Sequence, residues 1–229
     1  MNPDQHVIVD SVADVHRLRQ AFLLALGFVG LLWMIQLASL AFGLNLAGFA
    51  VFPGRVQALP GIVFAPLLHG SVSHLLANTS AVLILGTTLL YGYPKAARIA
   101  LPAIWLGAGL AVWLLARPAY HLGASGLTFG ALFFVFTLGV LRWDRRAIAL
   151  ALVVFLLYGG MIWGVLPGDP GVSFEYHLAG AALGVLLAVL LKDADPPPPA
   201  KVYSWERGDE DDDWPFPEMR GEAEPPRER

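Results

Sequence analysis

The sequence predicts an all-α membrane protein, a bundle of six transmembrane helices with an embedded first loop. Hydrophobic residues make up 56% of the 229-residue chain, and charged residues only 14%. A soluble domain of this size cannot bury so much apolar surface. Six segments are long and apolar enough to cross a hydrocarbon core about 30 Å thick, or nearly so. They cover residues 21–43, 72–92, 96–116, 124–141, 147–166 and 174–191.

The first apolar segment, 21–43, is predicted to be a membrane anchor that is retained in the protein. It is too long for the hydrophobic region of a cleavable signal peptide, and its polar leader contains Asp4, Asp10 and Asp14. The stretch that follows, residues 45–70, is rich in Gly and Pro but also apolar. It is too interrupted for a spanning helix and too apolar for a free loop, so we expect it to be embedded or interfacial.

The basic residues predict the orientation of the bundle. If the N-terminus is cytoplasmic, the outer loops hold two basic residues, Arg55 and Arg117, while the inner flanks hold eight. The inner ones are Arg17, Arg19, Lys95, Arg98, Arg142, Arg145, Arg146 and Lys192. This positive-inside bias predicts that both termini are cytoplasmic. The fourth segment then runs inward, and Ser125 at its start lies near the outer face.

The two ends of the chain differ in composition from the membrane domain, residues 21–192. Residues 1–20 are predicted to be a cytoplasmic N-terminal segment. Residues 193–229 combine proline blocks with acidic runs, which cannot bury a core, so we expect a disordered cytoplasmic tail. The chain has no cysteine, which excludes disulfides and thiol catalysis. There is no basic stripe of the kind that binds nucleic acid.

Polar side chains within the apolar segments are the candidates for function, because they are costly in a membrane. They are His69, His74, Asn78, Ser125 and His177. By the predicted orientation all of them lie toward the outer side of the bilayer. His74 and Asn78 are four residues apart and therefore share a helix face. His69 comes before that helix and is better placed to brace a loop or a cap.

Ser125 and His177 are predicted to meet in a hydrated pocket below the outer surface. A helix from Ser125 to Leu141 rises only about 24 Å, so its start lies within the membrane, where irregular backbone requires protein or water around it. Small residues allow helices to approach closely; they recur every four residues at Gly126 and Gly130, and again in the last segment. If those faces meet, the His177 imidazole can accept the Ser125 proton and activate the hydroxyl.

An oxyanion formed at Ser125 would need hydrogen-bond donors. The His74 imidazole and the Asn78 amide could supply them, together with the Ser125 backbone N–H at a helix N-terminus. Glu175 is near in sequence but lies on another helix face from His177, so we expect a dyad and no orienting carboxylate.

Other interpretations of the same residues remain open at this point. A serine before an apolar helix is ordinarily an N-cap. A histidine and an asparagine within a membrane can simply join helices by hydrogen bonds. His121, in the loop before Ser125, is expected to be solvated or interfacial. A transporter, or a metal site of His69, His74 and His177, is disfavoured because the spans lack acidic residues and the chain lacks an H-E-x-x-H motif.

Three stretches resemble the signatures of the rhomboid intramembrane serine proteases. "HGSVSHLLAN" has their H-x4-H-x3-N spacing, "GASG" their G-x-S-G segment, and "HLAGAALG" their H-x2-G-x3-G final helix. The likeness covers roughly residues 20–191, with the motifs on the second, fourth and sixth segments in the right order. A lone G-x-S-G recurs by chance, but three ordered signatures are specific.

The resemblance implies a role for each matching position. Ser125 corresponds to the nucleophile and His177 to the general base, while His74 and Asn78 resemble the oxyanion-stabilising pair. His69 resembles the histidine that supports the first loop.

Two departures from the family pattern bear on the supporting residues. Gly123 and Gly126 match the glycines that flank the nucleophile, but Phe129 replaces the tyrosine that many members stack on the catalytic histidine. A phenyl ring can still pack against imidazole. The first loop has Arg55 without the Trp-Arg pair of many members, which bears on how rigidly that loop is held.

The function that the resemblance implies is that of an intramembrane serine endopeptidase. It would cleave peptide bonds within or beside transmembrane segments by a Ser-His dyad, through an acyl-enzyme, with no cofactor and no metal. Its partners would be transmembrane protein substrates and membrane lipids. A six-helix core suggests a prokaryote, hence a bacterial inner membrane. The alternative is a non-catalytic rhomboid-like protein that binds transmembrane clients, and the oligomeric state stays open.

Overall fold

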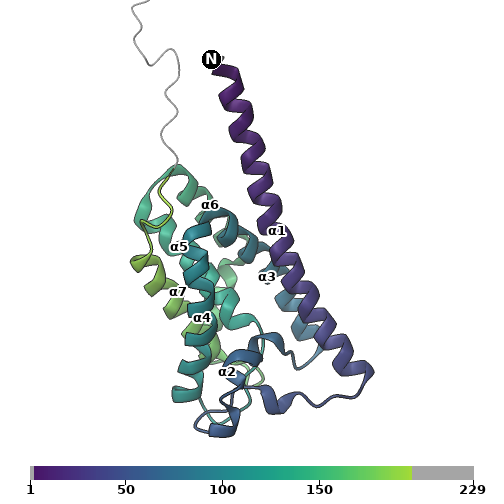
Figure 1. Ribbon diagram of the computed structural model, residues 1–229. Helices are drawn as coiled ribbons and strands as arrows, with labels where there is room; N and C mark the ends of the chain where they lie inside the picture. Colours follow the sequence, from purple (N-terminus) through teal and green to yellow (C-terminus); the bar gives the residue numbers. More distant parts are fainter. Residues whose placement is uncertain (1–2, 198–229) are drawn as a thin grey trace, which may run out of the picture. The chain divides into compact units, whose positions relative to one another are not determined.

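The computed structural model describes residues 3–197, and side chains from residue 12 onward. In that range the regular structure is helical, apart from one isolated bridge between Val51 and His121. The main helices are α1 (Pro3–Ala41), α3 (Val72–Gly92), α4 (Pro94–Leu115), α5 (Ser125–Arg142), α6 (Arg145–Tyr158) and α7 (Phe174–Leu190) (Figure 1). Most of the expected tail, residues 198–229, lies outside the described residues. The predicted helical membrane bundle is confirmed.

Five helices in the described range are long and apolar enough to span a membrane. The fifth of these consists of α6 and a 3-10 extension, Gly159–Val165, where a continuous helix over 147–166 was expected. α7 is apolar but has only 17 residues, which corresponds to about 26 Å. Large hydrophobic side chains are exposed along α1, α6 and α7, as expected for surfaces that face lipid.

Short polar side chains determine where several helices begin. Ser71, Asp144 and Ser173 are the N-caps of α3, α6 and α7, and each accepts a hydrogen bond from a backbone N–H in the first turn. α4 begins at Pro94, which suits the first helical position because its missing N–H would have no partner there.

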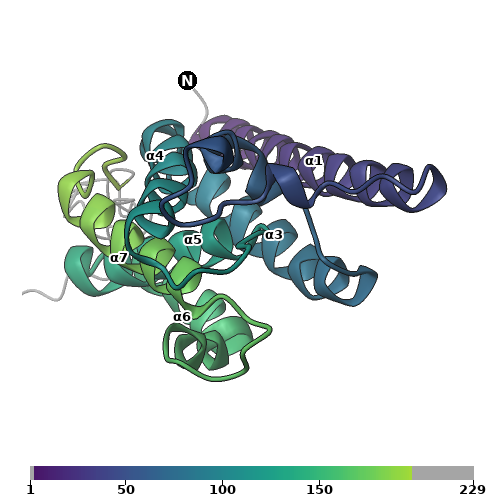
Figure 2. The same ribbon diagram turned by 90° about the horizontal axis from the view of Figure 1, so that it is seen from below.

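α5 lies in the middle of the bundle and contacts α3, α4, α6 and α7 (Figure 2). Its closest neighbour is α7, because glycines face one another across their interface. A Cβ on Gly180 would collide with the Gly126 carbonyl, and one on Gly184 with the Gly130 carbonyl. The predicted meeting of these two glycine faces is therefore seen in the structure, and it brings the helix of His177 against the helix of Ser125.

The loop between α1 and α3 is packed against the bundle and contains short helical turns: Ala47–Phe49, Val56–Ala58, α2 (Gly61–Phe64) and Ala65–Leu67. Ala50, Val51 and Ala65 are fully buried. Two tryptophans of α4 hold the loop: Trp105 Nε1 donates to the Val63 carbonyl, and Trp113 Nε1 donates to the Arg55 carbonyl, each at 2.9 Å. These two hydrogen bonds anchor the first loop, whereas the sequence alone had pointed only to Arg55 in this role.

Residues that follow α7 belong to the folded unit, which extends to Pro197. The Asp195 carboxylate accepts hydrogen bonds from the backbone N–H groups of Lys95 and Ala96 at the start of α4. The Arg142 guanidinium donates to the Asp195 carbonyl. Negative charge at a helix N-terminus is favourable, so this contact fixes the end of α7 beside α4 and α5.

Candidate active site

An open cavity of about 1040 Å³ lies between α3, α5 and α7, beneath the loops that precede α5 and α7. Ser125, His177, His74, Asn78 and Phe129 all line it. Five of the residues singled out from the sequence therefore share one cavity, although they come from three helices. His69 lies beside it, with its ring 5.0 Å from that of His74 in an edge-to-face arrangement.

Ser125 is the first residue of α5 and is half-buried. The N-cap position belongs to Ala124, so the Ser125 side chain is not used as the helix cap. Gly123 just before it has a φ of +118°, which favours glycine. A Cβ at Gly123 would also lie 2.8 Å from Cε1 of His74. The turn thus presents the hydroxyl to the cavity and lets α3 approach the turn.

Three successive contacts attach this turn to the first loop. Val51 and His121 exchange two backbone hydrogen bonds, of 3.0 and 2.8 Å. The Gly123 N–H donates to the Ala65 carbonyl at 2.9 Å. The Ala124 N–H points to Nε2 of His69 at 3.4 Å. His69 therefore contacts the start of α5.

His69 must be neutral to accept that hydrogen bond. Burial, and after it the neighbouring His74 imidazole, lower the pKa of His69 to about 4. The ring therefore keeps a free lone pair at neutral pH, and Nε2 can serve as an acceptor for the Ala124 N–H.

His177 is held on two sides. Its ring stacks on Phe129, with 4.0 Å between the centroids and 8° between the planes. Its Nδ1 lies 3.0 Å from the carbonyl oxygen of Gly164, in the 3-10 segment after α6. A carbonyl can only accept, so Nδ1 carries the proton and Nε2 keeps a lone pair. That is the tautomer a general base at Nε2 requires.

Gly164 has no counterpart among the residues predicted for the site. A Cβ there would lie 2.7 Å from the Phe129 ring and 3.3 Å from Nδ1 of His177, so glycine allows the stacked pair to approach the backbone carbonyl. One of several glycines in an apolar span carries no signal that singles it out.

Ser125 and His177, the proposed catalytic pair, are not in direct hydrogen-bond contact. Among the described residues, no hydrogen bond joins the Ser125 hydroxyl to an imidazole. Such bonds often tighten only when substrate binds. Both side chains line the same cavity, so they lie neither on opposite sides of the bundle nor in dry packing.

His74 and Asn78 lie on one face of α3, as their spacing predicts. Asn78 is buried, and its side-chain amide donates to the His74 carbonyl at 3.1 Å. An amide has two N–H groups, so one remains available to the cavity. Within the described residues, no group of three or more His, Cys, Asp or Glu side chains could hold a metal ion.

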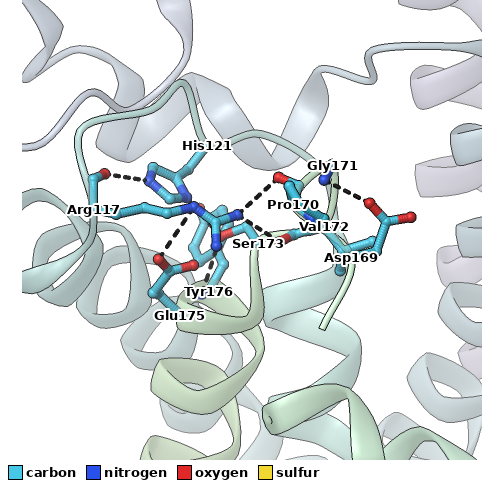
Figure 3. Close-up of polar contacts among 9 residues, drawn as sticks. All are labelled: Arg117, His121, Asp169, Pro170, Gly171, Val172, Ser173, Glu175 and Tyr176. Atoms are coloured by element: carbon cyan, nitrogen blue, oxygen red, sulfur yellow. Dashed lines mark hydrogen bonds and ion pairs between the residues drawn. The ribbon is translucent and has the colours of Figure 1, made fainter. Parts of the chain in front are cut away.

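His121 was expected to be solvated or interfacial, and that expectation was wrong. It is only 1% exposed, and both ring nitrogens have polar neighbours: Ser173 Oγ at 2.6 Å and the Arg117 carbonyl at 3.0 Å (Figure 3). Arg117 forms an ion pair of 3.5 Å with Glu175.

These features define an integral membrane protein of helical-bundle architecture, with a cavity among its apolar helices that is lined in part by polar side chains. A family model described as "Rhomboid domain" matches residues 57–194. The chain belongs to the rhomboid family.

The chain is also similar to mycobacterial proteins whose names read "Uncharacterized protein". One from Mycobacterium tuberculosis and one from Mycobacterium bovis are each 38% identical over 175 residues, covering 72% of this chain and 73% of the relative. One from Mycobacterium leprae is 34% identical over 179 residues, covering 72% of this chain and 69% of the relative.

Proposed function

We propose that this protein is an intramembrane serine endopeptidase that cuts peptide bonds within or beside transmembrane segments of other proteins. One observation carries the proposal: Ser125 and His177 line the same open cavity, and the Gly164 carbonyl leaves Nε2 of His177 free to accept a proton. Membership of the rhomboid family supports the same reaction class.

In the proposed reaction the Ser125 oxygen attacks the carbonyl carbon of the scissile peptide, and its proton passes to Nε2 of His177. The carbonyl oxygen becomes an oxyanion, for which His74, Asn78 and the Ser125 N–H are the candidate donors. When the C–N bond breaks, His177 gives its proton to the leaving amine. A water then attacks the acyl-enzyme and gives its proton to Nε2 of His177. The ester C–O bond breaks, His177 returns the proton to the Ser125 oxygen, and the second product leaves with a new carboxyl group.

The proposed substrate class rests on the chemistry of peptide bonds in helices. A peptide bond inside a helix is shielded by its own hydrogen bonds, so the preferred substrate segment must unwind to enter the cavity. Small or helix-breaking residues near the cut favour this unwinding. The positive-inside bias supports cytoplasmic termini in a bacterial inner membrane, with the cavity toward the outer side.

The test is labelling by an active-site fluorophosphonate, which forms a covalent bond with an activated serine. We expect wild type to be labelled and to cleave a reporter transmembrane substrate, and the Ser125→Ala and His177→Ala variants to do neither. Undiminished cleavage by Ser125→Ala would refute the proposal. Failure of folded wild type to label would instead favour a non-catalytic protein that binds transmembrane clients.

A further inference from the structure

A hydrogen bond joins the two chain segments that carry the proposed dyad. Nδ1 of His121 lies 2.6 Å from Oγ of Ser173, and this contact lies next to the cavity that both residues line (Figure 3). His121 is four residues before Ser125, and Ser173 is four residues before His177. The bond therefore links the nucleophile's turn to the start of the helix that carries the base.

The surrounding partners determine the direction of this hydrogen bond. Nε2 of His121 lies 3.0 Å from the Arg117 carbonyl, which can only accept, so Nε2 carries a proton, and in the neutral imidazole Nδ1 is then the acceptor. The Ser173 hydroxyl must then donate to Nδ1. The same oxygen accepts from the Tyr176 N–H at 3.2 Å as the N-cap of α7. When His121 is neutral, every donor and acceptor in this chain of hydrogen bonds therefore has a partner.

Ser173 is also hydrogen-bonded directly to the backbone of His177, the proposed base. The Ser173 carbonyl accepts a hydrogen bond from the backbone N–H of His177 at 3.3 Å. A shift of Ser173 would therefore move the first turn of α7 and, with it, the imidazole.

Arg117 fixes the loop that leads into Ser173. Its guanidinium donates to the carbonyl oxygens of Pro170 and Val172, at 3.0 and 2.8 Å, and pairs with Glu175. The loop before His121, which carries Arg117, and the loop before Ser173 are thus joined through one side chain. Hydrogen bonds from a charged donor are stronger than neutral ones, so the two loops are held together as a unit.

We propose that His121 and Ser173 are positioning residues that align the His177 imidazole with the Ser125 hydroxyl. This inference rests on the proposed function and adds to it the pair that sets the geometry of the dyad. Neither side chain touches the reacting atoms; each acts through the backbone that holds Ser125 or His177. Misplacement of a catalytic group by about 1 Å can cost 100-fold in rate, so a single bond here is worth testing.

The test uses variants that separate this bond from its neighbours, in the full-length protein. Ser173→Ala and His121→Gln both remove the bond, whereas the glutamine amide can still reach the Arg117 carbonyl and leaves the Ser173 cap in place. Ser173→Thr keeps the hydroxyl. His121→Asn places an amide oxygen where Nδ1 lies. The readouts are kcat and KM on a reporter transmembrane substrate, and the rate of fluorophosphonate labelling.

We expect Ser173→Ala and His121→Gln to lower kcat and the labelling rate by about tenfold or more with KM unchanged. The double variant should be no slower than the slower single variant, because both lose the same bond. Ser173→Thr and His121→Asn should stay within about threefold of wild type. Asp144→Ala, which removes the α6 N-cap outside the cavity, should lower the melting temperature and leave kcat unchanged.

Three results would overturn the inference. The first is a wild-type kcat in folded Ser173→Ala and His121→Gln. The second is an equal loss of kcat in Asp144→Ala. In both cases the wild type is active, so the proposed protease function stands and only the positioning role fails. The third is a wild type that neither labels nor cleaves, which overturns the proposed function and this inference together.

Discussion

At the scale of single residues, Phe129 is the clearest departure from the family pattern that the structure accommodates. The phenyl ring stacks flat on His177, so the missing tyrosine hydroxyl leaves the platform intact. We expect Phe129→Leu to lower kcat about three- to tenfold, because an aromatic pair contributes about 0.5–1.5 kcal/mol. Phe129→Tyr should retain wild-type activity. Equal kcat in Phe129→Leu and wild type would show that stacking does not orient the imidazole.

The second prediction for a single residue concerns Gly164, because its backbone carbonyl fixes the tautomer of His177. Gly164→Ala would place a Cβ 2.7 Å from the Phe129 ring and displace the stacked pair. We expect a loss of kcat of at least tenfold, since His177, the proposed base, would leave the position that the proposed reaction requires. Gly168→Ala, whose Cβ would meet nothing within 4 Å, serves as the control and should behave as wild type. Similar activities of the two variants would contradict the role of Gly164.

His69 gives the protein a pH dependence that can be worked out from its pKa of about 4, against 6.5 for a free histidine. Between these values the unfolded chain binds a proton at this site and the folded chain does not. The free energy of unfolding therefore rises with pH in that window, and the contribution is lost as pH falls from 6.5 toward 4. The loss amounts to up to about 3 kcal/mol.

The measurement is unfolding by denaturant in detergent, at several pH values between 4 and 7, for wild type and His69→Gln. A glutamine oxygen can accept from the Ala124 N–H but does not titrate in this range. The variant should therefore lose part of the pH dependence and keep most of its stability at pH 7. An identical pH dependence in both proteins would assign the effect to other groups.

At the scale of elements, the α5–α7 interface depends on glycines that leave no room for a side chain. A Cβ on Gly180 would overlap the Gly126 carbonyl, which is backbone and cannot move aside. We expect Gly180→Ala to destabilise the bundle by about 1–3 kcal/mol, by overpacking. Gly30→Ala in α1 is the matched control, because its Cβ would meet nothing within 4 Å. The readout is the thermal midpoint in detergent, and equal midpoints would contradict the packing argument.

The elements also show why some features were predictable and others were not. Hydropathy located the six helical segments, because a membrane imposes a length and a composition on each helix. It did not distinguish α6 from its 3-10 extension, since together they form one apolar stretch. The glycine repeats placed α5 against α7 correctly. The burial of His121 was missed, because its partners Arg117 and Ser173 lie on loops whose meeting depends on the tertiary fold.

In the candidate site, too, some features could be predicted from the sequence and others could not. Ser125, His177, His74 and Asn78 stood out because polar groups are rare in apolar segments, and all four line one cavity. The Gly164 carbonyl did not stand out, since every residue carries a backbone carbonyl and only the fold selects this one. Side-chain chemistry is thus readable from the sequence, whereas the backbone groups that orient it emerge only with the structure.

At the scale of the whole molecule, the open prediction is the orientation in the membrane. Eight basic residues flank one side of the predicted bundle and two flank the other, so the loop after α1 should face outward and the α5–α6 turn inward. The chain has no cysteine, so single cysteines report on accessibility without a background. Asn45 and Arg145 are both exposed; Asn45 lies in the loop after α1, and Arg145 is the first residue of α6, directly after the α5–α6 turn.

We expect a membrane-impermeant maleimide to label Asn45→Cys in intact cells, and to label Arg145→Cys only after the membrane is permeabilised. The physical reason is that basic residues resist translocation across the bilayer, so we expect Arg142, Arg145 and Arg146 to be cytoplasmic. Activity of each variant on a reporter substrate checks that the bundle is intact. The reverse labelling pattern would place the cavity on the cytoplasmic side, and substrates would then have to be cut at their inner ends.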